Sequence, residues 1–202
     1  MTHDPQRTAL IAVDVQRDFL PGGALAVPDG DAVIAPLLRI AAVVDVVIAT
    51  RDWHPLQHMS FTVRGGHWPE HCVQNTPGAE VTSQIASSAD VIISKGDDPA
   101  VDAYSGFDGT GLAELLRERG VSRVIIGGLA TDYCVRATAL DAVAAGFETV
   151  VAADAVRAVN IHLGDEDAAL EDLLAAGVRL WTSKQIVETG FGTARNHQEI
   201  IP

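Results

Sequence analysis

Reactive side chains follow several of the short apolar runs in this sequence. Asp14 follows one run, Lys95 follows another, and Cys134 comes a few residues after a third. A thiol can attack a carbonyl carbon, and a carboxylate can take and return the thiol proton. A lone cysteine, aspartate or lysine is most often structural or solvated, so each residue alone indicates little. Their shared position after apolar runs favours a hydrolytic centre with a cysteine nucleophile.

Cys134 lies near the start of an expected helix. We expect Thr131 to be the N-cap of this helix, which would place Cys134 at the third helical position. The free N–H groups and the positive end of the helix dipole favour a thiolate there. Lys95 would lower the pKa of the thiol further. The same N–H groups could stabilise an oxyanion.

A second group of residues has the composition of a metal site. Asp52 and His54 are two positions apart in an expected extended segment, so their side chains point to the same side. His71 could return from a later loop as a third ligand, giving two histidines and one carboxylate. His58 or Ser60 could add a direct or water-mediated contact. Taken alone, the D-x-H pattern favours a plain Asp–His hydrogen bond.

The elements that must position these residues are short strands alternating with helices. The apolar runs rich in Val and Ile predict buried strands at Leu10–Val13, Val46–Ala49, Val91–Ile93, Val124–Ile126, Thr149–Ala152 and Val178–Trp181. Helical stripes are formed by Leu112, Leu115 and Leu116, by Val135 (or Ala139), Leu140 and Val143, and by Leu170, Leu173 and Leu174, with Gly120, Gly146 and Gly177 as expected stops. This alternation predicts a Rossmann-like α/β fold with a parallel sheet of about six strands covered on both faces. Ligands bind beyond the carboxyl ends of such strands, where the reactive residues would gather.

The segment Pro55 to Ala79 is too long for an ordinary connection and holds several histidines. A long segment of this kind is usually functional or disordered, and its His-Pro and Trp-Pro pairs indicate order. We see no linker, so one domain over residues 1–202 is expected. The polar stretch after Glu188 is expected to be a surface tail.

Composition narrows the class of partner. Lys and Arg number 14 against 27 Asp and Glu, a net charge of −13 that disfavours nucleic acids and anionic membranes. The two cysteines, with no apolar signal-peptide core in Met1 to Thr8, indicate reduced thiols and a cytoplasmic protein. Cys72 is expected to be structural, although it adjoins His71. No apolar stretch approaches the ~20 residues of a membrane helix.

Longer stretches resemble a known family. They are Ala12-Val13-Asp14-Val15-Gln16-Arg17-Asp18-Phe19, Thr50-Arg51-Asp52-Trp53-His54-Pro55, Trp68-Pro69-Glu70-His71-Cys72-Val73, Lys95-Gly96, Asp102-Ala103-Tyr104-Ser105-Gly106-Phe107 and Gly128-Leu129-Ala130-Thr131-Asp132-Tyr133-Cys134-Val135. In this order they resemble the nicotinamidases of the isochorismatase-like hydrolase superfamily, over roughly Ala9 to Trp181. Co-linear motifs are far more specific than any one of them.

The resemblance implies a fold, a reaction and roles for residues. The fold would be a three-layer α/β/α sandwich around a six-stranded parallel sheet. The reaction would convert nicotinamide to nicotinate and ammonia through a cysteine thioester, in NAD salvage, and pyrazinamide is often accepted. Matching positions are Asp14, Lys95 and Cys134 for the triad, Asp52, His54 and His71 for one divalent metal, the N–H groups of Ala130 and Cys134 for the oxyanion hole, a cis peptide between Leu129 and Ala130, and Phe19, Trp68, Tyr104, Leu129 and Tyr133 for the substrate pocket.

Several alternatives stay open at this point. Zn²⁺ is the first expectation for the metal, and Fe²⁺ and Mn²⁺ also suit such ligands. The aromatic residues could equally be plain core packing. Another cysteine amidohydrolase of the superfamily, with a carbamoyl or ureido substrate, is an alternative function, and so is a non-catalytic metal-binding protein on the same scaffold. The oligomeric state, a homo-oligomer included, and the preference between nicotinamide and pyrazinamide are not fixed by the sequence.

Overall fold

The structure is a computed structural model that describes residues 6–191. Its centre is a six-stranded sheet in the order β3-β2-β1-β4-β5-β6, in which every neighbouring pair is parallel. The strands are β1 (Arg7–Val13), β2 (Val46–Asp52), β3 (Val91–Lys95), β4 (Val121–Leu129), β5 (Glu148–Arg157) and β6 (Arg179–Trp181). Each predicted apolar run lies in one of them, apart from Val178, which directly precedes β6.

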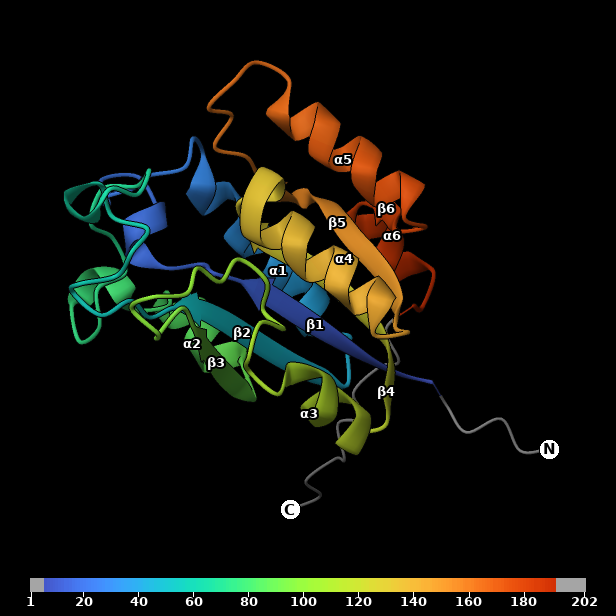
Figure 1. Cartoon of the computed structure of the whole chain (residues 1–202). Coiled ribbons are helices and arrows are strands. Elements are labelled where there is room, and N and C mark those ends of the chain that lie inside the picture. The colour runs from blue at the N-terminus through green and yellow to red at the C-terminus, as the bar shows by residue number, and fades with distance from the viewer. Residues whose placement is uncertain (1–5, 192–202) are drawn as a thin grey trace.

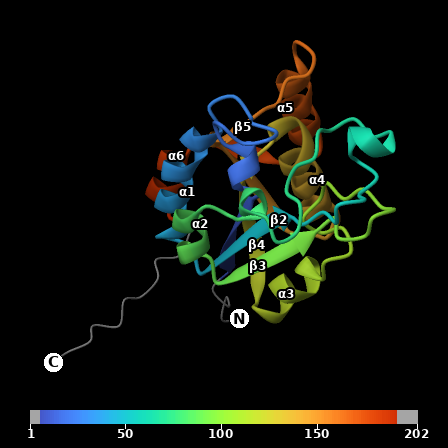
Figure 2. The same cartoon turned by 90° about the vertical axis from the view of Figure 1, so that its left-hand side faces the viewer.

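Helices cover both faces of this sheet, as Figures 1 and 2 show. One face carries α1 (Ile34–Ala41), α2 (Ser83–Ser88) and α6 (Ser183–Glu188), and the other carries α3 (Leu112–Glu118), α4 (Arg136–Ala144) and α5 (Asp165–Ala175). Each face encloses its own cluster of buried aliphatic side chains against the sheet. The expected three-layer α/β/α sandwich is therefore confirmed.

The strand order has a switch point between β1 and β4. The chain builds the sheet outward from β1 through β2 to β3, then returns to the other side of β1 with β4. Gly128 permits a close approach there: its φ is 125°, and a Cβ on it would lie 2.0 Å from the carbonyl oxygen of Val13. In open α/β sheets such a point is where ligands bind.

Local predictions mostly agree with the structure. Gly120, Gly146 and Gly177 follow α3, α4 and α5 with positive φ, as a helix stop requires. The stripe on α5 is narrower than expected, because Leu173 is buried whereas Leu174 is 55% exposed.

The segment between β2 and α2 is ordered, as expected. It contains the short 3₁₀ turns Thr62–Arg64 and Pro77–Ala79 and a bridge between His54 and Val73. Most of the predicted tail after Glu188 lies outside the described residues.

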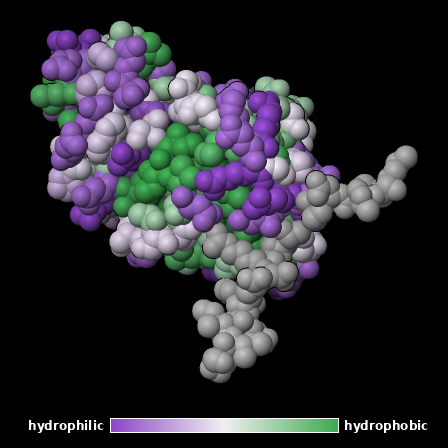
Figure 3. Space-filling model, turned by 90° about the horizontal axis from the view of Figure 1, so that it is seen from below, coloured by the Kyte–Doolittle hydropathy of each residue, from purple (hydrophilic) through white to green (hydrophobic). Residues whose placement is uncertain are grey.

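The outer surface is mixed in character. Strand β3 forms one edge of the sheet and carries Ile92, which is 41% exposed. Figure 3 shows the molecule from below. Hydrophobic residues gather near the middle of the face seen there, and hydrophilic residues border them. Within residues 6–191, no helix combines the length and apolar character needed to cross a bilayer.

Candidate active site

The structure brings Asp14, Lys95 and Cys134 together at the carboxyl edge of the sheet. Asp14 directly follows β1, Lys95 ends β3, and Cys134 lies in the first helical turn after β4. The Lys95 ammonium lies 3.0 Å from Asp14 Oδ2 and 3.5 Å from Cys134 Sγ. Thr50 donates a 2.6 Å hydrogen bond to Asp14 Oδ1, which fixes the carboxylate from β2. Residues more than a hundred positions apart thus form one cluster.

Burial controls how these groups hold their protons. Burial raises the pKa of Asp14, and the opposing effect of the Lys95 ammonium does not cancel it. Burial would lower the pKa of Lys95, but the carboxylates of Asp14 and Asp52 raise it well above its ordinary value, so the ammonium stays charged. Burial also raises the pKa of the Cys134 thiol well above its ordinary value, and the Lys95 charge offsets only part of that.

The expectation of a lowered thiol pKa is therefore wrong for this structure. Burial of a residue that is 6% exposed raises the pKa of the Cys134 thiol, the nearby carboxylates of Asp14 and Asp52 raise it further, and the Lys95 charge does not offset them. A neutral thiol beside a carboxylate with a raised pKa is still suited to catalysis. The proton can pass from Cys134 to Asp14 as the sulfur attacks.

The turn that carries Cys134 also differs from expectation. It is a π-helical turn over Thr131–Val135 that continues into α4, and its N-cap is Ala130. Thr131 is the first helical residue, so its predicted role as N-cap is wrong, and Cys134 is at the fourth position. The Ala130 carbonyl accepts hydrogen bonds from the amides of Tyr133 and Val135. The peptide between Leu129 and Ala130 is cis, as the resemblance implied.

Asp52, His54 and His71 form a second cluster beside the first. One ligand atom from each lies within 4.8 Å of the others, and all three residues are buried. Both imidazoles are oriented through Nδ1, which is 2.8 Å from the Gly96 carbonyl for His54 and 2.8 Å from the Pro69 carbonyl for His71. This leaves Nε2 of each ring available, and such supporting contacts on the far ring nitrogen are typical of metal ligands.

The chemistry of this donor set fits a divalent metal. Burial lowers the pKa of His71, which favours the neutral imidazole that a metal requires. The pKa of Asp52 is lowered, because Lys95 and His54 outweigh the effect of burial, so Asp52 offers a carboxylate. Gly96 makes the arrangement possible: its φ is 65°, and a Cβ on it would lie 2.6 Å from the His54 ring.

Asp52 belongs to both clusters. Its Oδ1 lies 2.5 Å from the Lys95 ammonium, while its Oδ2 lies 3.6 Å from His54 Nε2. Gln16 holds the backbone of Asp52 in place: it donates to the Asp52 carbonyl and accepts from the Asp52 amide, both at 2.8 Å. We did not single out Gln16 from the sequence.

His58 is less suited to bind a metal directly. Its Nδ1 lies 2.7 Å from Ser60 Oγ, and its Nε2 lies 3.1 Å from the Val101 carbonyl. Both ring nitrogens are therefore engaged, whereas Ser60 lines the cavity. Phe61, which is fully buried, packs its ring against His54, His58 and His71. No sequence signal marked Phe61 as part of the site.

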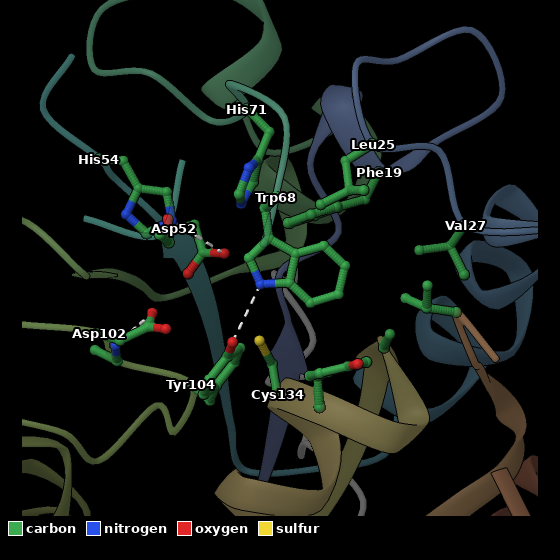
Figure 4. Close-up of a pocket in the computed structure, with 15 residues that line it drawn as sticks. Phe19, Leu25, Val27, Asp52, His54, Trp68, His71, Asp102, Tyr104 and Cys134 are labelled. Carbon is green, nitrogen blue, oxygen red and sulfur yellow. Dashed lines mark hydrogen bonds and ion pairs between the residues drawn. The ribbon is translucent and has the colours of Figure 1, made fainter. Parts of the chain in front are cut away.

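A cavity lies beside Cys134 and the Asp52–His54–His71 cluster (Figure 4). Its lining includes the predicted residues Phe19, Asp52, His54, Trp68, His71, Tyr104, Ala130, Tyr133 and Cys134. Trp68 Nε1 donates a 3.1 Å hydrogen bond to the hydroxyl of Tyr104, and the Trp68 ring packs edge-on against Tyr133 at 5.0 Å. Burial raises the pKa of Tyr104 to about 12, so its hydroxyl stays protonated.

The prediction for Leu129 needs correction. Within the described chain it is not among the residues that line the cavity, and its side chain, 1% exposed, packs in the core beneath. Other lining residues were missed from the sequence, namely Leu25, Val27, Ala103 and Val159, together with Asp102. Cys72 lies in the core with its amide bonded to Asp18, which agrees with a structural role.

Comparison with known proteins places this site in a family. The isochorismatase domain model matches residues 8–185. The chain belongs to the isochorismatase family. Among the curated isochorismatase-like relatives are the nicotinamidase of Escherichia coli (strain K12), 38% identical over 90% of this chain and 97% of the relative, and the nicotinamidase/pyrazinamidase of Mycobacterium tuberculosis, 44% identical over 85% and 97%.

A solved structure gives the same result in three dimensions. The pyrazinamidase of Pyrococcus horikoshii, described in complex with zinc, is 51% identical and superposes with a TM-score of 0.82 over 87% of this chain and 99% of that one. The family match runs from β1 through β6 and includes every residue of the two clusters. The α/β/α fold of this isochorismatase family member is therefore shared with nicotinamidase-like enzymes.

Proposed function

We propose that this isochorismatase family member is a nicotinamidase, an amidohydrolase that converts nicotinamide and water to nicotinate and ammonia. The observation that carries the proposal is one cavity lined by both Cys134 and the Asp52–His54–His71 cluster, with Asp14 and Lys95 buried behind Cys134 and Lys95 paired to Asp52. The nicotinamidase names of relatives at 38% and 44% identity support it. Pyrazinamide, a ring of the same size with the same carboxamide, is a second substrate.

The reaction begins at Cys134. Asp14 takes the thiol proton as the sulfur attacks the carboxamide carbon, and the amides of Ala130 and Cys134 stabilise the oxyanion. Lys95 remains an ammonium and holds the Asp14 carboxylate at 3.0 Å. Asp14 then gives the proton to the departing ammonia, leaving a thioester. It next takes a proton from water, whose oxygen replaces the sulfur and releases nicotinate, and the proton returns to Cys134.

Asp52, His54 and His71 would hold one divalent metal, with Ser60 as an additional oxygen nearby. When bound, the metal would supply a Lewis-acid contact for the ring nitrogen and so fix the carboxamide toward Cys134. We infer Zn²⁺ as the resident ion, on the donor set and on the zinc complex of the Pyrococcus horikoshii relative. Phe19, Trp68, Tyr104 and Tyr133 would enclose the ring. A cytoplasmic location, from the reduced thiols, stays a prediction.

The test measures ammonia release from nicotinamide by purified protein reconstituted with Zn²⁺. We expect turnover by the wild type, and a loss of about 10⁴-fold or more in Cys134→Ala, because Cys134 is the thiol that lines the cavity. Cys72→Ala is the matched control, and it should retain turnover. Absence of release by the wild type would contradict the function, and release that survives Cys134→Ala would contradict the mechanism.

A carbamoyl or ureido amide is the alternative substrate class. Such a substrate is linear and brings no aromatic nitrogen to the metal cluster. The same assay therefore distinguishes the two, since a carbamoyl amidase would release ammonia from ureido compounds but not from nicotinamide.

A further inference from the structure

One wall of the cavity comes from the loop that follows β5. Val159 in this loop lines the cavity and packs against the core. The amides of Val159 and Asn160 donate hydrogen bonds to the two carboxylate oxygens of Asp132, at 3.0 and 2.9 Å. Asp132 lies two positions before Cys134, in the same helical turn. A single side chain thus connects the turn that carries the nucleophile to the opposite wall.

The loop is held at this point from two sides. Asn160 has a φ of 53°, and its Oδ1 accepts a 3.0 Å hydrogen bond from the Glu166 amide at the start of α5. Hydrogen bonds to a carboxylate are roughly twice as strong as neutral ones. The backbone at Val159 is therefore fixed by Asp132 on one side and by α5 on the other.

We propose that Asp132 is a positioning residue for the substrate. Its carboxylate accepts hydrogen bonds from the two loop amides and so holds Val159 against the bound ring. Among the described residues, Asp132 does not line the cavity, whereas its neighbours Tyr133 and Cys134 do. It would act through Val159 and not by touching the substrate. The identity of the ring rests on the nicotinamidase function proposed above.

This role predicts a specific kinetic effect. Without the carboxylate the two amides lose their acceptors, the loop moves outward, and the wall recedes from the ring. The reacting groups Asp14, Lys95 and Cys134 are held by other contacts, through Thr50 and the strand ends. The ring would be held less tightly in the ground state and the transition state alike, so KM rises while kcat changes little.

The experiment compares Asp132→Ala, Asp132→Asn and Asp172→Ala in the full-length, metal-loaded protein. Asp172→Ala is the matched control, because it removes an exposed ion pair between Arg136 and α5 and leaves the Val159 loop untouched. Asp132→Asn keeps one acceptor oxygen, and it serves as the milder variant should Asp132→Ala not fold. Each substitution is also made in a Val159→Ala background, and amide exchange of Val159 and Asn160 is measured in every variant.

We expect Asp132→Ala to raise KM for nicotinamide about tenfold with kcat within about twofold, and Asp132→Asn to raise it about threefold. Exchange at Val159 and Asn160 should quicken in both, and stay unchanged in Asp172→Ala. In the Val159→Ala background, Asp132→Ala should raise KM for nicotinamide by less than about twofold.

Three results for Asp132→Ala would overturn the proposal. They are an unchanged KM, a fall in kcat at constant KM, and a tenfold rise in KM that persists in the Val159→Ala background. A wild-type protein that does not hydrolyse nicotinamide would overturn the proposed function separately. In that case slower or unchanged amide exchange at Val159 and Asn160 in Asp132→Ala would also contradict the role of Asp132 in holding the loop. Faster exchange at these amides would support that role.

Discussion

The two sides of the cavity are built in different ways. The reactive side is polar and buried, and its groups come from strand ends or the turn just after one: Asp14 after β1, Asp52 at the end of β2, and Lys95 at the end of β3. The opposite side is apolar and comes from loops, through Leu25, Val27 and Val159. The strands of a parallel sheet fix the first side by register, whereas the second depends on individual loop contacts such as that of Asp132. Strand ends thus set the two carboxylates and the ammonium, whereas the apolar wall depends on irregular backbone.

The largest effect should come from breaking the reactive side at Lys95. In Lys95→Met, Asp14 and Asp52 lose the cation between them, so turnover should fall about 10³-fold or more and stability by about 3–5 kcal/mol. Urea unfolding and the ammonia assay measure the two losses. Lys184→Met, which removes an exposed pair with Glu188, is the control and should change stability by less than about 0.5 kcal/mol. A fully active, stable Lys95→Met protein would contradict the view that the buried charges at the strand ends set the reactive side of the cavity.

A smaller effect is expected one contact further out, at Gln16. Gln16→Ala removes both hydrogen bonds to the backbone of Asp52 and should weaken Zn²⁺ binding about 10- to 100-fold. Calorimetric titration with Zn²⁺ measures this without any substrate. Gln84→Ala, on the exposed surface of α2, should bind as the wild type does. Equal affinities in the two variants would show that β2 alone fixes Asp52.

The ionisation of Cys134 gives a test by pH. Because burial raises the pKa of this thiol, the thiol form prevails at neutral pH and the thiolate gains with rising pH. In a metal-free Cys72→Ala background, alkylation by iodoacetamide should therefore quicken about tenfold per pH unit below that pKa. Mass spectrometry of the modified peptide follows the rate. A rate that is already maximal and flat at pH ~6 would indicate a lowered pKa instead.

The smallest effect is expected on the apolar side. Leu25→Ala removes part of the wall and should raise KM for nicotinamide about fourfold with kcat nearly unchanged, since Leu25 is half-buried and its truncation costs about as much as one buried methylene group, about 0.8 kcal/mol. Steady-state kinetics measure this, with the fully exposed Leu163→Ala as control. A loss of kcat in Leu25→Ala would mean that the wall also orients the carboxamide.

The residues at strand ends can be predicted from the sequence, whereas the residues that loops bring to the cavity cannot. Runs of Val and Ile locate the strands, so the residues that follow them, Asp14, Lys95, Asp52 and His54, can be placed at one edge of the sheet from the sequence alone. The wall residue Val159 gives no such signal, because a loop brings it to the cavity through a side chain 27 positions away. The thiol pKa was predicted wrongly for a related reason, since burial is a property of the packed molecule.

The strand order also has a consequence for how the protein becomes active. Residues up to Lys95 form a half-sheet that holds the carboxylates, the histidines and the ammonium, while Cys134 arrives only when β4 pairs with the open side of β1. Without β4, β1 would be an unprotected edge, the kind that invites misassembly. In the folded chain β4 covers that edge, and the turn that directly follows β4 carries Cys134. Activity therefore requires the pairing of β1 with β4 at the centre of the sheet. A chain that lacks this pairing would not have Cys134 in place beside Asp14 and Lys95.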